Sequence, residues 1–526
     1  MNGTYGAIVI GSGFGGAVSA CRLAEAGERV LVLERGKRWQ AEEFPRALED
    51  QWLFDVDEPE EQHGWIDLRL FRHVGVIQGA GVGGGSLIYA NVSVPAERFA
   101  FESGWPAEIT FNELAPHYAT TGRMLDVQEL PEGQTTKRLE LMREAAAAIG
   151  DVDRFRKLPL AVRFDPQWSY ATCAPHDKSK SHFQTNAFGR QQGTCIHCGN
   201  CDIGCPVAAR NTLDLNYLAV AEDHGAEIRP LHLVHSIERI GDGYRVHYKR
   251  LDTGGIESAT ATRVIVAAGS LGSTELLLRC RDQHKTLPKL SQQLGRGWCA
   301  NGDFLSPAIF DDREISPTWG PTITAAIDYL DGSDGGRRYF VEDGGFPDVI
   351  GNLMRAALVR KPGLGSTLLY LIWRYALRGR LRGRNVMSSL MPWFGQGVDC
   401  PDGVMTLKRQ WFRRHKRLML DYDVKASRPV VQALIDRHRR LTEATGGSII
   451  VPPSWSWFHY LITPHPLGGC NMGRDSANGV VDHRGEVFGY PGLYVLDGSI
   501  VPRALGLNPS RTIAALTERS MSLMLQ

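Results

Sequence analysis

Short apolar runs followed by glycine turns and helical stretches recur along this chain. The first run occupies residues 7–10 and leads into Gly11-Ser12-Gly13-Phe14-Gly15-Gly16, after which residues 17–26 follow a helical pattern. A second apolar run at residues 30–33 ends in Glu34. Fully apolar runs of this length, joined by a helix, are typical of buried parallel strands. The pattern predicts the strand–helix–strand unit of an α/β fold.

The same pattern returns in the middle and at the end of the chain. Residues 263–269 form an apolar run and a small-residue turn ahead of a helical stretch, and residues 493–498 repeat the run ahead of a last helix at 512–525. Between them, residues 301–464 give irregular strands and a long helical stretch at 429–445. We therefore predict an α/β (α+β overall) protein whose Rossmann-like domain is discontinuous in sequence.

The glycines of the first turn indicate a dinucleotide site. Gly11 permits the tight turn, Gly13 lets the backbone approach a pyrophosphate, and Gly16 lets the helix pack on the strand. The helix N-terminus then directs its amides at the phosphates, and Glu34 stands where an acidic residue accepts the hydroxyls of adenosine ribose. The motif is shared by FAD and NAD proteins and does not choose between them.

A second glycine-rich segment, residues 79–85, precedes Ser86. Because residues 87–92 follow at once as an apolar run, we expect an ordered strand there, with a flexible linker as the alternative. Backbone without Cβ atoms can lie directly against a flat ring or a phosphate. Gly83, Gly84 and Ser86 are therefore candidate cofactor contacts.

Composition narrows the functional classes. The 526 residues suffice for two domains. A net charge of +1 gives no reason to expect nucleic acid as a partner. The first six residues lead directly into the first strand without a basic or apolar export segment, so we expect a cytoplasmic protein.

Three separated segments together resemble the glucose-methanol-choline (GMC) family of flavin oxidoreductases. They are the first glycine motif, the glycine-rich run before Ser86, and Thr-Pro-His-Pro-Leu-Gly-Gly-Cys at 463–470 with Asp497 and Asn508-Pro509. Residues 81–87 and 465–469 are most similar to the cholesterol oxidase branch. The resemblance implies FAD, an antiparallel-sheet substrate domain and oxidation of an alcohol by hydride transfer to the flavin. The chain departs from that branch at residues 89–91, and no motif reveals the glutamate that moves the double bond in sterol enzymes.

The resemblance also implies interleaved domains. It places the FAD-binding domain at 1–125, 211–300 and 465–526, a connecting or substrate-cap segment at 126–210, and the substrate-binding domain at 301–464. It implies cofactor-binding residues in several of these segments: Gly11, Gly13, Phe14, Gly16, Glu34, Gly83, Gly84, Ser86, Asn91, Val234, Asp497, Gly498 and Pro509.

His465 and Asn508 are the candidate catalytic residues. Alcohol oxidation needs a base for the hydroxyl proton, and free histidine titrates near neutral pH. His465 lies between two prolines that restrain its backbone, and its alternative role is that of a histidine satisfied inside a turn. Asn508 precedes Pro509 at the start of the last helix, where it could hold the substrate oxygen, cap the helix, or do both. Asp497 and Gly498 contact FAD or form a simple turn.

Four cysteines follow a spacing known from iron-sulfur proteins. Cys195, Cys198, Cys201 and Cys205 precede Pro206, as in bacterial ferredoxin runs, and some GMC sugar dehydrogenases are similar in this respect. A cluster there would pass electrons to an external acceptor. The alternatives are a zinc site and a compact loop of reduced thiols without metal.

A basic and apolar segment lies within the predicted substrate domain. Residues 352–398 contain no Asp or Glu. They include the apolar stretch 364–377, and further arginines follow this stretch up to residue 384. The stretch is too short to span a bilayer. We therefore predict a helix at residues 364–384 that makes peripheral contact with an anionic membrane. The alternative is a helix that covers the substrate domain and keeps its arginines in solvent.

These observations predict an FAD-dependent enzyme that oxidises a bulky lipophilic alcohol, with a 3-hydroxysteroid or sterol as the best candidate. Oxygen or an external electron acceptor would be its second partner. A GMC-type sugar or polyol dehydrogenase that uses an iron-sulfur cluster is the alternative enzyme. A flavin and iron-sulfur electron carrier without its own substrate is the alternative of another class, and His465 with Asn508 argues against it.

Overall fold

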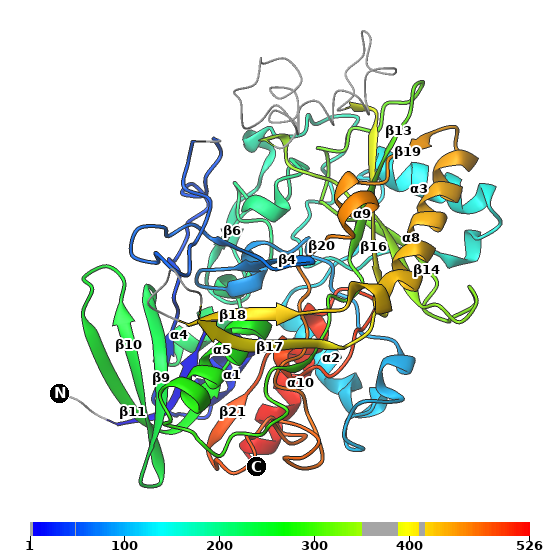
Figure 1. The fold of residues 1–526 in the computed structure, drawn as a ribbon. Coiled ribbons are helices and arrows are strands. Elements are labelled where there is room, and N and C mark those ends of the chain that lie inside the picture. Colours follow the sequence, from blue (N-terminus) through cyan, green and yellow to red (C-terminus); the bar gives the residue numbers. More distant parts are fainter. Residues whose placement is uncertain (1–3, 48, 350–387, 410–415) are drawn as a thin grey trace.

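The computed structural model describes residues 4–47, 49–349, 388–409 and 416–526. Its first layer is a seven-stranded sheet in the order β8-β2-β1-β11-β10-β9, with β21 also paired to β11 (Figure 1). The parallel strands are β1 (Tyr5–Ile10), β2 (Val30–Leu33), β8 (Glu227–Arg229), β11 (Ile256–Val266) and β21 (Leu493–Val495). The antiparallel extension consists of β9 (His232–Ile240) and β10 (Gly243–Arg250).

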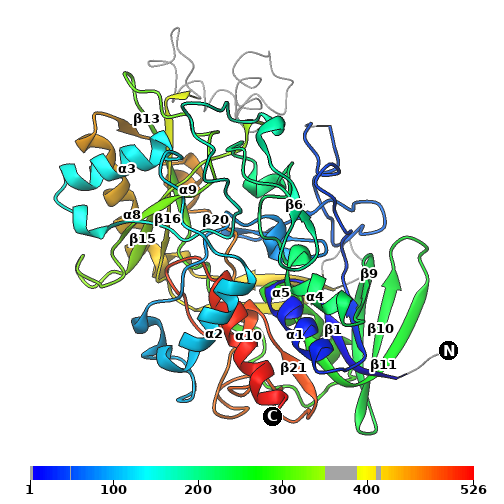
Figure 2. The same ribbon diagram turned by 180° about the vertical axis from the view of Figure 1, so that it is seen from behind.

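Helices cover this sheet, which explains its apolar strands. All four residues of β2 are buried. The helices of this part are α1 (Phe14–Glu25), α4 (Tyr217–Asp223), α5 (Gly269–Leu278) and α10 (Ser510–Met524), and α1 packs against both α4 and α10 (Figure 2). The register places Ile10 beside Leu33 and Val266, so these strands end at one edge of the sheet. Ligands of such sheets bind at this carboxyl edge.

The second layer is a six-stranded antiparallel sheet in the order β19-β13-β16-β15-β14-β5. Its strands are β5 (Phe155–Lys157), β13 (Phe304–Ile309), β14 (Ala325–Asp328), β15 (Tyr339–Asp343), β16 (Leu390–Gly397) and β19 (Ser448–Ile449). Helices α3 (Lys137–Ala148) and α8 (Val424–Ala444) pack on it and on each other. The predicted fold class, a Rossmann-like part with an antiparallel-sheet part, is confirmed.

Smaller elements connect the two layers. One three-stranded sheet contains β3 (Ile66–Leu70), β4 (Val74–Gly79) and β20 (Leu461–Thr463), and a second contains β12 (Arg296–Trp298), β17 (Gly403–Arg409) and β18 (Lys416–Asp421). β4 and β20 lie between the two layers in both views (Figures 1 and 2). Among the described residues, the remaining strands and α-helices are β6 (Gln184–Thr185), β7 (Gln191–Gln192), α2 (Phe111–Met124) and α9 (Pro453–Phe458).

One predicted strand is wrong. Residues 87–92 form no named strand, because the chain turns through a 3-10 helix, Gly84–Leu87, after Gly83 and Gly84 adopt positive φ angles of 106° and 51°. The segment is nevertheless ordered, and it does not behave as a flexible linker. The predicted membrane-contact segment 364–384 lies outside the described residues. Among the residues that are described, no helix is long and apolar enough to cross a membrane.

Candidate functional site

A cavity of about 1130 Å³ lies at the carboxyl edge of the parallel strands and reaches the antiparallel sheet. It exceeds the ~300–1,000 Å³ that is usual for a small-molecule pocket, so a dinucleotide and a substrate could share it. Most of the predicted site residues line it: Gly11, Gly13, Phe14, Glu34, Gly84, Val234, His465, Asp497, Gly498, Asn508 and Pro509. Gly16, Gly83, Ser86 and Asn91 are not among its lining residues.

The turn between β1 and α1 forms one wall of the cavity. Gly11 has a φ of 95°, and a Cβ there would lie 2.4 Å from the carbonyl oxygen of Ala267. A Cβ on Gly13 would instead meet no protein atom closer than 3.9 Å. The space beside Gly13 is therefore open to the cavity, as a closely approaching pyrophosphate requires.

Glu34 is held rigidly beside this turn. Its Oε2 accepts hydrogen bonds from the Ser12 amide (3.0 Å) and hydroxyl (2.6 Å), and its Oε1 accepts one from the Gly36 amide (2.9 Å). Burial raises the pKa of Glu34, and these donors oppose that rise. The carboxyl group lines the cavity with lone pairs left over, which suits the acceptance of ribose hydroxyls.

The second glycine-rich segment lies directly on the first. A Cβ on Gly84 would lie 2.6 Å from the Cα of Gly13, and one on Gly79 would lie 2.2 Å from the carbonyl oxygen of Gly84. Only glycine permits this approach of two backbones. Where the two segments meet, they form a cradle of glycine backbone on the cavity wall, which fits the pyrophosphate of FAD.

The four predicted residues outside the cavity wall have structural contacts. Gly16 packs against Gly11, where a Cβ would lie 2.0 Å from the Gly11 carbonyl oxygen. Ser86 donates a hydrogen bond to the Gly83 carbonyl (2.8 Å) and accepts one from the Leu213 amide (3.1 Å). Asn91 is fully buried with a φ of 68°, and no hydrogen-bond partner of its side chain is found in the described structure.

His465 follows β20 and is anchored by a buried carboxylate. Its Nδ1 lies 3.0 Å and 3.1 Å from the two carboxylate oxygens of Asp303, and its backbone amide donates to the Thr463 hydroxyl (2.9 Å). A carboxylate only accepts, so Nδ1 carries the proton and Nε2 is the basic nitrogen. The His465 side chain is 16% exposed and lines the cavity, whereas that of Asp303 is 0% exposed.

Asn508 lies on the cavity wall beside a second buried acid. The N-cap of α10 is Pro509 without a side-chain hydrogen bond, so Asn508 does not cap this helix. Glu342 accepts a hydrogen bond from the Gln396 side chain (2.9 Å), and burial raises its pKa strongly, which favours its protonated form. The Asn508 Oδ1 has no partner in the described structure, which leaves it for a ligand.

Sequence motifs revealed neither Asp303 nor Glu342. Asp303 precedes β13 and lies 162 positions from His465 in the sequence, and Glu342 belongs to β15. An acidic residue in or next to an apolar strand pattern could have indicated them. Such a residue is expected to be buried, and a buried acid needs a partner. Asp497, by contrast, was predicted, and its carboxylate accepts hydrogen bonds from the amides of Gly269 (2.9 Å) and Ser499 (2.8 Å). It therefore also stabilises a turn.

Beyond His465 the cavity has apolar walls. Residues of the antiparallel sheet and its loops contribute here together with β20, and the apolar ones are Leu305, Ile323, Phe346, Phe394 and Ile462. Leu305 and Ile462 are 44% and 52% exposed, which places them at the mouth. This end favours a lipophilic ligand.

The cysteine run gives no support for the predicted iron-sulfur cluster or for zinc. None of its four cysteines forms a disulfide, and burial raises the pKa of the Cys195, Cys198 and Cys201 thiols. Within residues 4–349, 388–409 and 416–526, residue 48 excepted, no group of three or more His, Cys, Asp or Glu side chains could hold a metal ion. The run nevertheless adjoins the cavity, because Asp202 and Ile203 line it.

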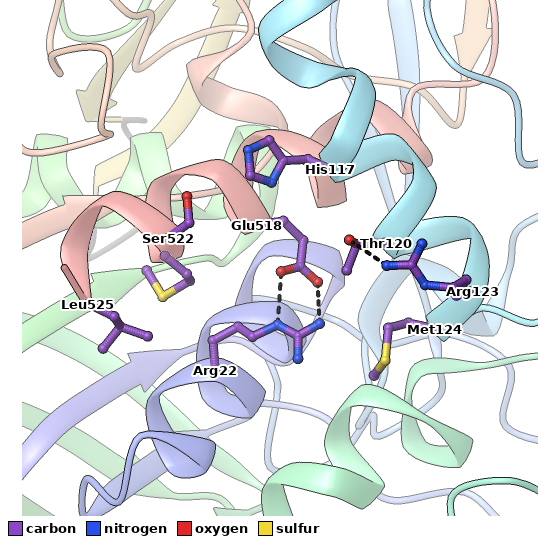
Figure 3. A pocket seen from close by; sticks show the side chains of 9 residues that line it. Arg22, His117, Thr120, Arg123, Met124, Glu518, Ser522 and Leu525 are labelled. Carbon is purple, nitrogen blue, oxygen red and sulfur yellow. Dashed lines mark hydrogen bonds and ion pairs between the residues drawn. The ribbon is translucent and has the colours of Figure 1, made fainter.

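A second, smaller pocket of about 520 Å³ lies between α1, α2 and α10 (Figure 3). Its charged side chains are satisfied internally, since Arg22 forms two hydrogen bonds with Glu518 (2.8 and 2.7 Å). Its lining residues are not shared with the large cavity, and they do not form a recognisable catalytic arrangement.

Comparison with known proteins gives a consistent result. Residues 7–294 and 422–517 match the N-terminal and C-terminal parts of GMC oxidoreductases. Cholesterol oxidases of Acinetobacter baumannii and Mycobacterium tuberculosis are each 32% identical to this chain over 99% of its length, and the matches cover 94% and 91% of theirs. A long-chain-alcohol oxidase of Arabidopsis thaliana is 22% identical over 96% of this chain and 65% of its own. The crystal structure of pyridoxine 4-oxidase from Mesorbium loti has a TM-score of 0.64 at 16% identity and 98% coverage of both chains.

Proposed function

The chain belongs to the GMC oxidoreductase family, and from this premise we propose that it oxidises the CH–OH group of a bulky lipophilic alcohol, best a 3-hydroxysteroid. GMC oxidoreductases bind FAD, and the glycine cradle with Glu34 would hold it here. Bound FAD supplies the acceptor for the hydride that leaves the alcohol carbon.

One observation carries the proposal: a histidine on the wall of an apolar cavity, anchored at Nδ1 by a buried carboxylate. Nε2 of His465 accepts the hydroxyl proton as the alcohol is oxidised. The side-chain amide of Asn508, on the wall of the same cavity, donates an N–H to the substrate oxygen, so that the hydroxyl proton points at Nε2. The apolar walls exclude water from the reacting atoms.

The substrate class rests on two supports. The apolar walls at Leu305, Phe346 and Phe394 suit a fused-ring or long-chain alcohol better than a sugar, which needs many polar partners. The cholesterol oxidase of Acinetobacter baumannii is 32% identical to this chain, whereas the long-chain-alcohol oxidase is 22% identical. We propose oxygen as the electron acceptor, since the alternative of a dehydrogenase depended on the unsupported cluster.

A substrate comparison tests this function. Purified protein reconstituted with FAD is mixed without oxygen with cholesterol in detergent, with a long-chain primary alcohol, or with glucose, and the loss of oxidised-flavin absorbance is followed. We expect the sterol to reduce the flavin fastest and glucose to leave it oxidised. Reduction by glucose alone would overturn the lipophilic substrate class, and reduction by none would overturn the proposal that these alcohols are substrates.

A further inference from the structure

We propose that Asp303 is a positioning residue that orients His465 and stabilises the positive charge that His465 gains when it accepts the substrate proton. This inference rests on the proposed function, in which His465 is the base. It concerns a residue that directly precedes β13, 162 positions from His465 in the sequence.

The contacts around Asp303 form a closed set. Both carboxylate oxygens face Nδ1 of His465, at 3.0 and 3.1 Å. The Thr463 hydroxyl lies 2.6 Å from Asp303 Oδ2 and 2.9 Å from the Ala300 carbonyl oxygen, and it also accepts the His465 amide at 2.9 Å. Side chain and backbone of His465 are thus fixed to the same carboxylate group, directly and through one hydroxyl.

This arrangement allows one ring orientation and one tautomer. If the ring turned over, the Cδ2–H group would take the place of Nδ1, the hydrogen bond to the carboxylate would be lost, and Nε2 would leave its position on the cavity side. Burial raises the pKa of Asp303, and the facing His465 and the Thr463 hydroxyl oppose that rise. Because the carboxylate is wholly buried, little water screens it, so its attraction for an imidazolium ring is stronger than at a surface. A neutral imidazole gains much less, and the carboxylate therefore favours the state that follows proton transfer.

None of the neighbouring titratable groups in the described structure takes the role of Asp303 as the carboxylate that faces Nδ1 of His465. Glu342 on β15, Asp399 and Cys299 all lie within electrostatic range of it. Burial raises the pKa of Glu342 and of Cys299 strongly, which favours their neutral forms, and it raises the pKa of Asp399 to about 7. Asp399 accepts its hydrogen bonds from Tyr422 (2.6 Å) and the Ala300 amide (2.9 Å), not from His465.

Asp303→Asn tests the proposal, with Asp399→Asn as the matched control. Both substitutions replace a buried carboxyl group by an amide, but only Asp303 contacts His465. For Asp303→Asn with bound FAD, we expect flavin reduction by the best alcohol to slow about 10²–10⁴-fold with little change in the apparent substrate affinity. The pH at half-maximal rate should fall by about one unit, because a neighbouring anion no longer favours the protonated ring. Asp399→Asn should keep both properties close to those of the wild type.

A second readout needs no substrate. Diethylpyrocarbonate reacts with neutral imidazole, and mass spectrometry of the His465 peptide gives its modification rate as a function of pH. In Asp303→Asn the midpoint of this profile should shift to lower pH in the same way. An unchanged rate and unchanged midpoints would overturn the proposal. If no alcohol reduced even the wild-type flavin, the proposed function would fail while the modification profile still decided the role of Asp303.

Should Asp303→Asn not fold, Thr463→Val gives the same test in weaker form. It removes the hydroxyl that connects Asp303 to the His465 amide and leaves the carboxylate in place. We expect about a tenfold slower flavin reduction, as for loss of a single orienting hydrogen bond. A rate equal to that of the wild type would contradict the proposed positioning.

Discussion

Two glycines of the first turn should respond in opposite ways to a side chain, although both belong to the same motif. Gly13 has ordinary extended angles (φ −70°, ψ −168°), and the nearest protein atom to an added Cβ would lie 3.9 Å away. At Gly15 an added Cβ would lie 1.5 Å from the Leu496 carbonyl oxygen. Gly13→Val should therefore fold and lose FAD, whereas Gly15→Ala should be strongly destabilised.

The magnitudes follow from these contacts. At the helix N-cap, replacing Gly13 costs only some tenths of a kcal/mol to about 1 kcal/mol of stability. The valine side chain would fill the space beside the cradle and displace the pyrophosphate from the α1 amides. Losing two hydrogen bonds to a charged group costs about 3–6 kcal/mol, which weakens FAD binding about 10²–10⁴-fold. The clash at Gly15 involves two backbones and should cost more than about 4 kcal/mol.

Flavin titration of the apoproteins, with circular dichroism melting, measures both effects. Gly13→Val should melt within a few degrees of the wild-type apoprotein and show strongly weakened quenching of flavin fluorescence. The reasoning is refuted if Gly13→Val binds FAD as tightly as the wild type, or if it loses FAD only because it has unfolded.

Three further predictions concern buried groups away from the cradle. Burial lowers the pKa of His438 to about 3, so the unfolded chain binds an extra proton below about pH 6.5 and stability falls as the pH drops. At pH 5.5 this loss is about 1.4 kcal/mol, and His438→Leu should remove that share of the difference between urea unfolding curves at pH 7.5 and 5.5, while His197, whose pKa burial also lowers to about 3, keeps its own share. Arg138→Met should destabilise by about 3–5 kcal/mol in the same assay, since it leaves the wholly buried Asp343 uncompensated, and a loss under 1 kcal/mol would contradict the pairing. Metal and sulfide analysis of anaerobically purified protein should find neither iron nor zinc in stoichiometric amount, and iron that disappears with sulfide in Cys201→Ser would reinstate the cluster.

The sequence predicted those parts of the fold and site that depend on neighbouring residues. The run at residues 7–16 and the acid at Glu34 form a local unit, in which apolar strands, turn glycines and helix all agree. The strand predicted at residues 87–92 failed because Gly83 and Gly84 curl the backbone onto Gly13, a contact that joins distant segments.

The acids at the catalytic centre could not be predicted for a related reason. His465 stands in a distinctive motif, but its partner Asp303 comes from another layer of the protein, and Glu342 from a strand whose pattern marks it only as buried. Without a fold, nothing in the spacing brings these three residues together. The motif thus identified the base, and only the tertiary structure identified the groups that hold it and Asn508.

The most direct test of the account is anaerobic stopped-flow flavin reduction by His465→Ala. The variant should bind FAD like the wild type, because His465 contributes no part of the glycine cradle. Flavin reduction by a saturating 3-hydroxysteroid should be slower by about 10²–10⁴-fold, the usual contribution of a general base, and the loss should shrink as the pH rises and the alcohol ionises more readily. A rate within a few-fold of the wild type, with FAD fully bound, would contradict the assignment of His465 as the base.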